Sequence, residues 1–355
     1  MKYKKLYKNL YKMKYKIVIV IIIIVIIIFI YNKIHNDINK VTLGNYLSKY
    51  FCNLGLATLN KKNFYADNII INVKGINIRT KTDFINLLPS YIPFDQNLKD
   101  EFDKYNITTN DISFIKNFLA ETWNINNKKK EIFWLILKKK INPILNNCLE
   151  KYNLKQDHNN LILHFRCSDV PFAKLNKYHL NKYKVFNEIL LKIKNKNVKF
   201  NKIIILSCNN HMSSNKNTKI CNLYTEDLKK YLINLGYNIE IQCNSLLQDF
   251  ALMFYAPITI SCGGSFSFMA GFFGNSLFYA CGHAEEGEMS LYYRYLMIKS
   301  YISEYFKFNS KMPILPITKC TDCGDWLNDN YILKHSDVKD YYDIDTVLKQ
   351  LRSTN

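Results

Sequence analysis

A chain of 355 residues, with 48% apolar and 22% charged residues, can hold one large domain or two of ordinary size, and this balance excludes global disorder. The formal net charge of +20 at pH 7 would also suit a nucleic-acid-binding protein. Lysine, asparagine, isoleucine and tyrosine dominate the whole chain, however, as AT-rich codon usage would produce. We therefore attribute the charge to composition and expect no nucleic-acid partner.

The N-terminal residues predict a membrane anchor. Seven lysines lie in residues 1–16, and residues 17–31 form an uncharged run of Ile, Val, Phe and Tyr. As a helix this run spans about 22 Å, which is short of a ~30 Å hydrocarbon core and suits a thin membrane of the endoplasmic reticulum or Golgi type. A cleaved signal peptide is the alternative, but no small-residue cleavage site follows the run. We expect an uncleaved anchor, with residues 1–16 in the cytoplasm and the rest of the chain in the lumen.

The ten cysteines leave the redox state open. In a lumenal compartment some could form disulfides, but the spacings do not define the pairing. Cys320 and Cys323 form one isolated CxxC motif. A zinc site needs about four ligands, and no second pair accompanies this one, so we expect no bound metal.

The chain divides into five segments after the basic tail. The divisions are the anchor at 17–31, a short stem at 32–45, an N-terminal domain at 46–158, a nucleotide-binding domain at 159–300 and a C-terminal helical segment at 301–355. Within the N-terminal domain the pattern predicts helices near 46–59, 112–122 and 131–149 and a strand at 68–73.

The second half alternates apolar, β-rich runs with amphipathic helical segments. The predicted strands are 161–165, 202–207, 239–242, 258–261 and 276–280, and the predicted helices are 179–194, 224–235, 245–254 and 266–273, with a last helix in 337–352. This alternation predicts an α/β fold with a parallel, doubly wound sheet. Ligands of such sheets bind at the carboxyl ends of the strands.

Two motifs lie at such strand ends. His164-Phe-Arg-Cys-Ser-Asp169 follows the first strand, and Gly263-Gly-Ser-Phe-Ser267 follows the fourth. A guanidinium at Arg166 could bind a phosphate with two hydrogen bonds, or it could pair locally with Asp169. The glycines allow a tight turn, after which Ser265 and Ser267 open a helix whose free amides could bind an anion; a capped helix without a ligand is the alternative.

Two further residues have open interpretations. Asp249, early in the helix before the fourth strand, could accept hydrogen bonds from the amidine edge of guanine, or it could simply interact with the helix dipole. His164 could contact a nucleotide, or it could be a packed histidine at the strand end. Phe266, Phe268 and Met269 are interpreted as helix packing.

The motifs at residues 164–169 and 245–274 resemble those of a known superfamily. HFRCSD is similar to an HxRxxD motif, and the Asp249 to Ser267 stretch to a D-(x)n-S-F-S motif, of the GDP-fucose-dependent fucosyltransferases, which include α-1,2- and α-1,6-fucosyltransferases and protein O-fucosyltransferases. The match covers roughly 161–275, with the motifs in the same order. The chain departs from the α-1,2 pattern HxRRxD at Cys167, and GGSFSF replaces Asn-Ser-Thr-Phe-Ser-Trp.

The resemblance implies a GT-B fold, with two Rossmann-type domains of which residues 46–158 form the acceptor side. It implies inverting transfer without a cofactor or metal. Arg166 would hold the β-phosphate of GDP-fucose, His164 would support the nucleotide and Asp249 would read guanine. The diphosphate cradle would consist of Gly264, Ser265, Phe266 and Ser267. Asp169 is the candidate general base, although it could only orient Arg166, the base could come from the first domain, or there could be none.

The preferred function is therefore a single-pass type II membrane glycosyltransferase of the Golgi or endoplasmic reticulum. It would transfer fucose from GDP-fucose to a glycan or glycoprotein; Asn106-Ile-Thr108 is a glycosylation acceptor sequence consistent with a lumenal domain. Alternatives are another nucleotide sugar, or a catalytically silent glycan-binding protein on the same fold. A metal-dependent transferase using Asp343-Ile-Asp345 is disfavoured, because Asp343 is expected to cap a helix. The sequence specifies neither acceptor nor linkage.

Overall fold

The computed structural model describes the chain in separate stretches. These are residues 43–66, 83–112, 127–155, 159–167, 170–172, 180–195, 197–209, 214–262, 264–280, 332–333, 337–338 and 340–353. The predicted anchor at 17–31, the predicted strand at 68–73 and the CxxC motif at 320–323 lie outside them. In these stretches no helix combines the length and apolar character needed to span a membrane.

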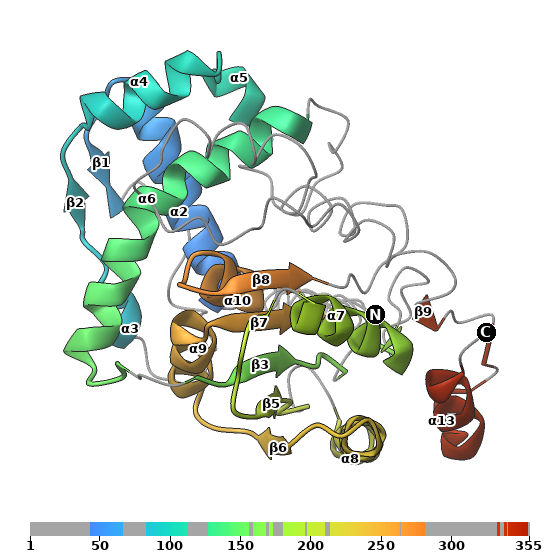
Figure 1. The fold of residues 1–355 in the computed structure, drawn as a ribbon. Coiled ribbons are helices and arrows are strands. Elements are labelled where there is room, and N and C mark those ends of the chain that lie inside the picture. Colours follow the sequence, from blue (N-terminus) through green and yellow to red (C-terminus); the bar gives the residue numbers. More distant parts are fainter. Residues whose placement is uncertain are drawn as a thin grey trace, which may run out of the picture. The chain divides into compact units, whose positions relative to one another are not determined.

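The centre of the described fold is a five-stranded sheet in which every neighbouring pair is parallel (Figure 1). The strands are β3 (Leu161–His164), β5 (Ile203–Leu206), β6 (Ile239–Gln242), β7 (Ile258–Ser261) and β8 (Leu277–Ala280), in the order β6-β5-β3-β7-β8. The chain builds outward from β3 to β6, then returns to the other side of β3. This is a Rossmann-like order, and its reversal point lies between β3 and β7. The predicted α/β class and parallel sheet are confirmed.

The strands form where the sequence predicts them because their residues suit burial on both faces. All four residues of β5 and of β7 are buried, as are the first three residues of β3. β-branched residues take three of the four positions in β5 and in β7, which favours the extended backbone of a covered sheet. The edge strand β6 differs, since Glu240, Ile241 and Gln242 are partly exposed.

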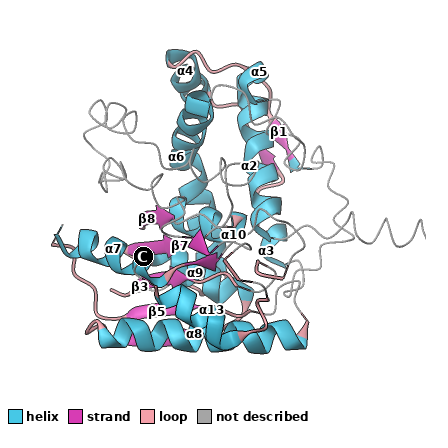
Figure 2. Cartoon of the chain, turned by 90° about the vertical axis from the view of Figure 1, so that its right-hand side faces the viewer, coloured by secondary structure: helices cyan, strands magenta, loops and turns pink. Residues whose placement is uncertain are grey.

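The helices that connect these strands are α7 (Tyr183–Asn195), α8 (Asn215–Asn234) and α9 (Leu246–Tyr255). α8 begins at Asn215, well before the predicted start at residue 224, because the Ser214 side chain accepts a hydrogen bond from the Asn217 N–H and caps the helix. Figures 1 and 2 both show α8 close to β5, and a hydroxyl contact joins the two segments. α9 starts with a capping box formed by Ser245 and Gln248.

The segment after β7 differs from the prediction of one helix at 266–273. It consists of the short α10 (Ser265–Ser267) and a π-helical turn, η4 (Phe268–Phe272). Close packing explains the irregularity. A Cβ at Gly274 would lie 2.3 Å from the Phe254 carbonyl oxygen, and one at Gly271 would lie 2.7 Å from the Phe278 ring, so the chain here is pressed against its neighbours.

The described part of the N-terminal half is mainly helical. Its elements are α2 (Leu43–Leu59), β1 (Phe64–Tyr65), α3 (Asp83–Asn86), β2 (Tyr91–Ile92), α4 (Gln96–Lys104), α5 (Thr109–Ile112) and α6 (Asn127–Lys151). β1 and β2 form an antiparallel pair. Within residues 43–66, 83–112 and 127–155 there is no parallel strand, so the second Rossmann-type domain expected for a GT-B fold is not found in this part of the chain.

Helix α6 packs directly on the segment that follows β7. Trp134 makes edge contacts with the rings of Phe268 and Phe273, at centroid distances of 6.2 and 5.7 Å. The Asn142 side chain donates a 2.8 Å hydrogen bond to the Phe273 carbonyl. The hydroxyl of Tyr255 donates to Asn146 at 3.0 Å. Helix α6 of the N-terminal half therefore packs against and supports the turn after β7.

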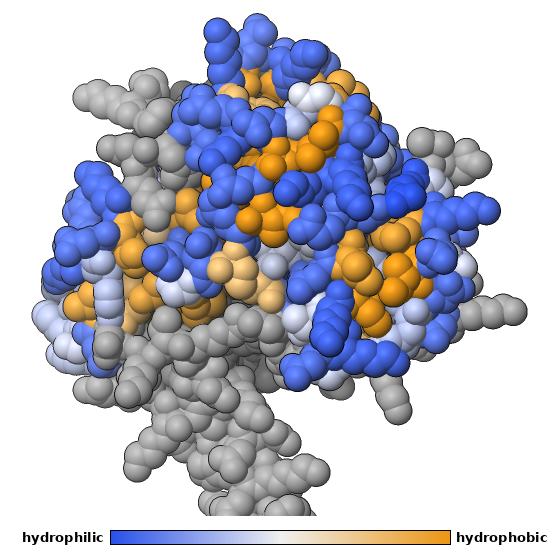
Figure 3. All heavy atoms as spheres, turned by 90° about the horizontal axis from the view of Figure 1, so that it is seen from below, coloured by the Kyte–Doolittle hydropathy of each residue, from blue (hydrophilic) through white to orange (hydrophobic). Residues whose placement is uncertain are grey.

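The C-terminal segment is attached to the sheet side by α13 (Ile344–Arg352) and by the antiparallel pair β4 (Leu180–Asn181) and β9 (Ile332–Leu333). Arg352 forms a two-bond ion pair with Asp227 of α8. Asp343 caps α13 by accepting a hydrogen bond from the Thr346 N–H, which confirms the capping interpretation of the Asp-Ile-Asp sequence. The surface of the molecule carries both apolar and polar side chains. On the face in Figure 3, hydrophilic side chains separate the apolar patches.

Candidate functional site

The two sequence motifs leave the sheet side by side. His164 of β3 is the register partner of Ser261 of β7, and the N–H of Cys262 donates a 3.1 Å hydrogen bond to the His164 carbonyl. Arg166 lies two residues beyond this pair on one strand, and Gly264 lies three residues beyond it on the other. Both motifs therefore start at the reversal point of the sheet, where parallel α/β sheets bind their ligands.

Arg166 is half-buried between two buried neighbours. Phe165 is packed against Phe186, and its N–H donates to the Leu206 carbonyl at 3.1 Å. Cys167 is fully buried and forms a disulfide with Cys221 of α8. The backbone of Arg166 is thus fixed on both sides, while Asp169, the candidate base, lies outside the described residues.

The turn after β7 requires a glycine. Gly264 has φ = +106°, a conformation that residues with a Cβ rarely adopt. Its carbonyl accepts hydrogen bonds from the Phe268 N–H and from the Ser267 hydroxyl, both at 3.2 Å. Gly263 lies outside the described residues, and Ser265 begins α10.

Ser267 supports this turn from the inside. It is fully buried, and its Oγ lies 2.6 Å from Oγ of Ser261. This hydroxyl is bonded to Ser261 and to the Gly264 carbonyl, so it fixes the shape of the turn. A role for Ser267 in the predicted diphosphate cradle stays a prediction.

His164 belongs to an aromatic cluster at the strand end. Its ring lies 6.1 Å from that of Phe266, which in turn contacts Phe250 of α9 edge-on at 5.8 Å. Phe268 and Met269 are completely buried, which confirms that they serve packing. The cluster joins β3, α10 and α9, and a contact between His164 and a nucleotide stays a prediction.

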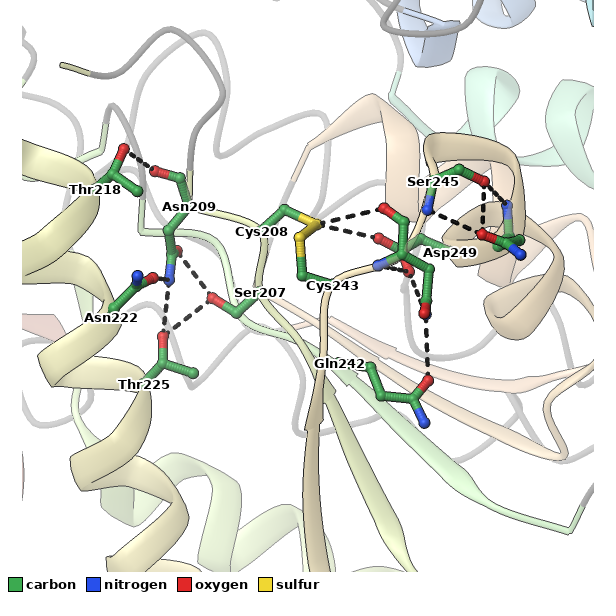
Figure 4. Close-up of a disulfide and its surroundings, with 12 residues drawn as sticks. Ser207, Cys208, Asn209, Thr218, Asn222, Thr225, Gln242, Cys243, Ser245 and Asp249 are labelled. Carbon is green, nitrogen blue, oxygen red and sulfur yellow. Dashed lines mark hydrogen bonds between the residues drawn. A yellow bond between two sulfur atoms is a disulfide. The ribbon is translucent and has the colours of Figure 1, made fainter. Parts of the chain in front are cut away.

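Asp249 is buried, with 7% of its surface exposed, and holds the loop between β6 and α9. Its Oδ1 accepts hydrogen bonds from the backbone N–H and the side chain of Asn244, at 3.3 and 3.0 Å. Its Oδ2 lies 3.4 Å from Sγ of Cys208 (Figure 4). A disulfide sulfur has no proton to donate, so we interpret that approach as a contact. A guanine amidine would have to use Oδ2 or displace Asn244.

The disulfides were left open by the sequence, and two are present among the described residues. Cys167 pairs with Cys221, and Cys208 pairs with Cys243 across the exits of β5 and β6, with Cα atoms 4.8 Å apart. Cys208 and Cys243 each follow a predicted strand directly, so knowledge of the strand order would have paired them. The other described cysteines, Cys52, Cys148 and Cys262, are buried and carry no disulfide.

A buried polar network beside the second disulfide was also missed (Figure 4). The Ser207 hydroxyl contacts Oδ1 of Asn209 at 2.8 Å and Oγ1 of Thr225 at 3.0 Å, and it donates to the Phe165 carbonyl at 3.1 Å. Asn209 also donates to Asn222 and Thr225. Small polar residues directly after a buried strand are the sequence signal for such a network.

Among the described residues, no group of three or more His, Cys, Asp or Glu side chains could hold a metal ion. Comparison of the chain with models of known protein families, with curated protein sequences and with solved structures returned no match.

Proposed function

We propose that this chain is a type II membrane glycosyltransferase that transfers fucose from GDP-fucose to a glycan or glycoprotein, with inversion. The observation that carries the proposal is the position of Arg166 and of the Gly264 turn at the exits of β3 and β7. A cation and a close backbone turn there suit the diphosphate of a sugar nucleotide.

The choice of arginine supports a role in phosphate binding. Four of the 49 Lys and Arg residues in this chain are arginines, so composition alone favours lysine at any basic position. Arginine presents a planar fork of donors that matches two phosphate oxygens, and lysine does not. When GDP leaves, negative charge develops on the diphosphate, and a donor already in place would stabilise that charge.

The disulfides support a lumenal location. Two cross-links join segments at the carboxyl edge of the sheet, and disulfides persist mainly in oxidising compartments. The lysine-rich N-terminus and the apolar run at 17–31 would place the enzyme in the Golgi or endoplasmic reticulum membrane with this body in the lumen.

The hydrogen bonds of Asp249 favour a second candidate, a catalytically silent glycan-binding protein on the same fold. Its Oδ1 is already occupied by Asn244, and a guanine reader would need free acceptors. A transferase for another nucleotide sugar is the nearer alternative, since the diphosphate part of the site would be retained.

The test is hydrolysis and transfer by the purified full chain in detergent, with a panel of nucleotide sugars, an array of glycan acceptors, and EDTA. We expect GDP-fucose to be consumed preferentially, with EDTA making no difference. Preference for another donor would replace the sugar assignment. Binding of GDP without turnover on any acceptor would favour the silent glycan-binding protein, and loss of activity with EDTA would contradict metal-free transfer.

A further inference from the structure

Helix α8 holds both neighbours of Arg166. Cys221 of α8 is bonded to Cys167, the residue after Arg166. One helical turn later, Thr225 contacts the Ser207 hydroxyl at 3.0 Å, and that hydroxyl donates to the carbonyl of Phe165, the residue before Arg166. We call these four residues, Cys167, Cys221, Ser207 and Thr225, the α8 clamp.

The geometry of α8 makes this double attachment possible. Residues four apart on a helix lie on the same face, so Cys221 and Thr225 both face the exit of β3. They are also bonded to each other, because the Thr225 hydroxyl donates to the Cys221 carbonyl at 2.9 Å. All four residues are buried, and Cys167, Cys221 and Thr225 are almost completely so.

Hydrogen bonds fix the backbone on both sides of Arg166, in addition to the side-chain contacts of the α8 clamp. The Phe165 N–H is bonded to β5, and the Cys167 carbonyl accepts a 2.7 Å hydrogen bond from the Val170 N–H. Each of these bonds holds a backbone group of a residue that flanks Arg166, Phe165 in the first and Cys167 in the second. A side chain that starts from a fixed Cα loses less freedom on gripping a ligand, which is the physical basis of preorganisation.

We propose that the α8 clamp is a positioning device for Arg166, which sets the direction of its guanidinium before a diphosphate arrives. This proposal rests on the proposed function, in which Arg166 binds the donor phosphate. Cys167 and Cys221 are then positioning residues that act through Arg166, and Ser207 and Thr225 reinforce them.

The central experiment is a double-mutant cycle on GDP affinity, measured by calorimetry with the full chain. The double variant Cys167→Ala/Cys221→Ala removes the cross-link without leaving a lone thiol, and Arg166→Ala removes the guanidinium. We expect the cysteine variant to bind GDP about tenfold more weakly. In a turnover assay its kcat should fall by about tenfold to a hundredfold, and its KM should change less than its kcat. In the Arg166→Ala background, removing the cross-link should change GDP affinity less than twofold. Effects that simply multiply would overturn the proposal.

A milder pair of variants covers the case in which the cysteine variant does not fold. Ser207→Ala removes one hydroxyl of the clamp and leaves the disulfide intact. Ser276→Ala is its matched control, because the Ser276 hydroxyl is also buried and donates to the carbonyls of Met253 and Ala256, but precedes the amino end of β8. We expect both variants to lose stability and only Ser207→Ala to lose GDP affinity, by about threefold to tenfold, which is the range of one hydrogen bond. Equal GDP affinity in the two variants would contradict the clamp.

One measurement separates failure of this inference from failure of the proposed function. The chain has four arginines, so ¹⁵N-arginine labelling gives few side-chain signals, and Arg352, paired with Asp227, reports on the fold. In Ser207→Ala and in the cysteine variant, the Arg166 signal should change its chemical shift and become narrower, while the Arg352 signal should keep its chemical shift and width. If the wild type binds no nucleotide, the proposed function fails and this spectrum alone decides the clamp. An unchanged Arg166 signal would overturn the clamp whatever the protein binds.

Discussion

Oγ of Ser261 and Oγ of Ser267 lie 2.6 Å apart, so the last residue of β7 is bonded directly to the residue that closes the turn around Gly264. Ser267 in turn donates to the Gly264 carbonyl. The turn is therefore attached to the strand through a buried pair of hydroxyls, and its shape follows from the end of β7. A change in the turn should consequently affect both stability and ligand binding.

Gly264→Ala should lower stability and donor binding together. Its φ of +106° is strained for a residue with a Cβ, at about 1–3 kcal/mol. Gly236→Ala is the matched control, because Gly236 also has a positive φ, +88°, with open space around its Cβ position and a place at the far end of α8. Chemical denaturation of both variants should show a loss, and GDP affinity should fall only for Gly264→Ala. A full GDP affinity in Gly264→Ala would remove this turn from the donor site.

Arg166→Ala should reduce GDP-fucose turnover by about 10² to 10³, the range found when one prearranged donor to a developing anion is removed. Arg166→Lys should recover only part of this loss, since an ammonium offers a point charge without the fork of donors. Arg352→Ala is the comparison, because it breaks the ion pair with Asp227 at the other side of α8 and should cost stability without a specific loss of kcat. Steady-state kinetics with thermal unfolding of each variant distinguishes the two. Similar kcat values for Arg166→Ala and wild type would end the proposal.

The sheet was predictable because its strands are short runs of β-branched residues, such as Ile203 to Ile205, separated by amphipathic helices. Such patterns depend on local sequence alone. The start of α8 was missed because residues 215–223 are polar and rich in asparagine, which favours helices weakly. The cap at Ser214 and the disulfide of Cys221 stabilise this first part of α8, and the disulfide cannot be predicted without knowledge of the tertiary fold.

The candidate site was predictable in position and less so in detail. Parallel strands end at one edge, so motifs after β3 and β7 had to lie near each other once the strands were adjacent. The inward orientation of Ser267 and the bonds of Asp249 to Asn244 could not be predicted, because both depend on the path of a loop after its strand. The π-helical turn likewise follows from close packing around Gly271 and Gly274, which no local pattern specifies.

Asp249→Asn separates the two interpretations of this residue. If its carboxylate reads guanine, the wild type should bind GDP at least tenfold better than inosine diphosphate, which lacks the 2-amino group, and the variant should lose that preference. Asn244→Ala serves as the control for the structural role, since it removes one hydrogen bond to Oδ1 and should cost about 1 kcal/mol of stability. Competition binding with the two nucleotides measures the preference. An unchanged preference in Asp249→Asn would leave Asp249 with its loop-holding role alone.

Lys138→Met should make the protein more stable at pH 7 and remove a contribution to stability that increases with pH. Burial lowers the pKa of Lys138 to about 8, although its Nζ lies 5.0 Å from the centre of the Phe272 ring, a contact that favours the charged form. This shift makes stability depend on pH. Between pH 8 and the ordinary lysine pKa near 10.4, the Lys138 side chain binds more protons in the unfolded chain than in the folded one, so its contribution to stability rises with pH. Lys138 alone should therefore raise the free energy of unfolding by about 2 kcal/mol from pH 7 to pH 9.5, and the variant should lack this contribution. Burial also raises the pKa of Cys148 to about 11 and that of Tyr279 to about 12. Both groups lower stability toward pH 9.5, but they do so alike in the wild type and the variant, so the difference between the two pH slopes isolates Lys138. Lys139→Met is the neighbouring control, which loses a partly exposed ion pair with Glu101 and should change stability by less than about 0.5 kcal/mol. Urea unfolding at the two pH values decides the prediction, and equal pH slopes in wild type and Lys138→Met would contradict it.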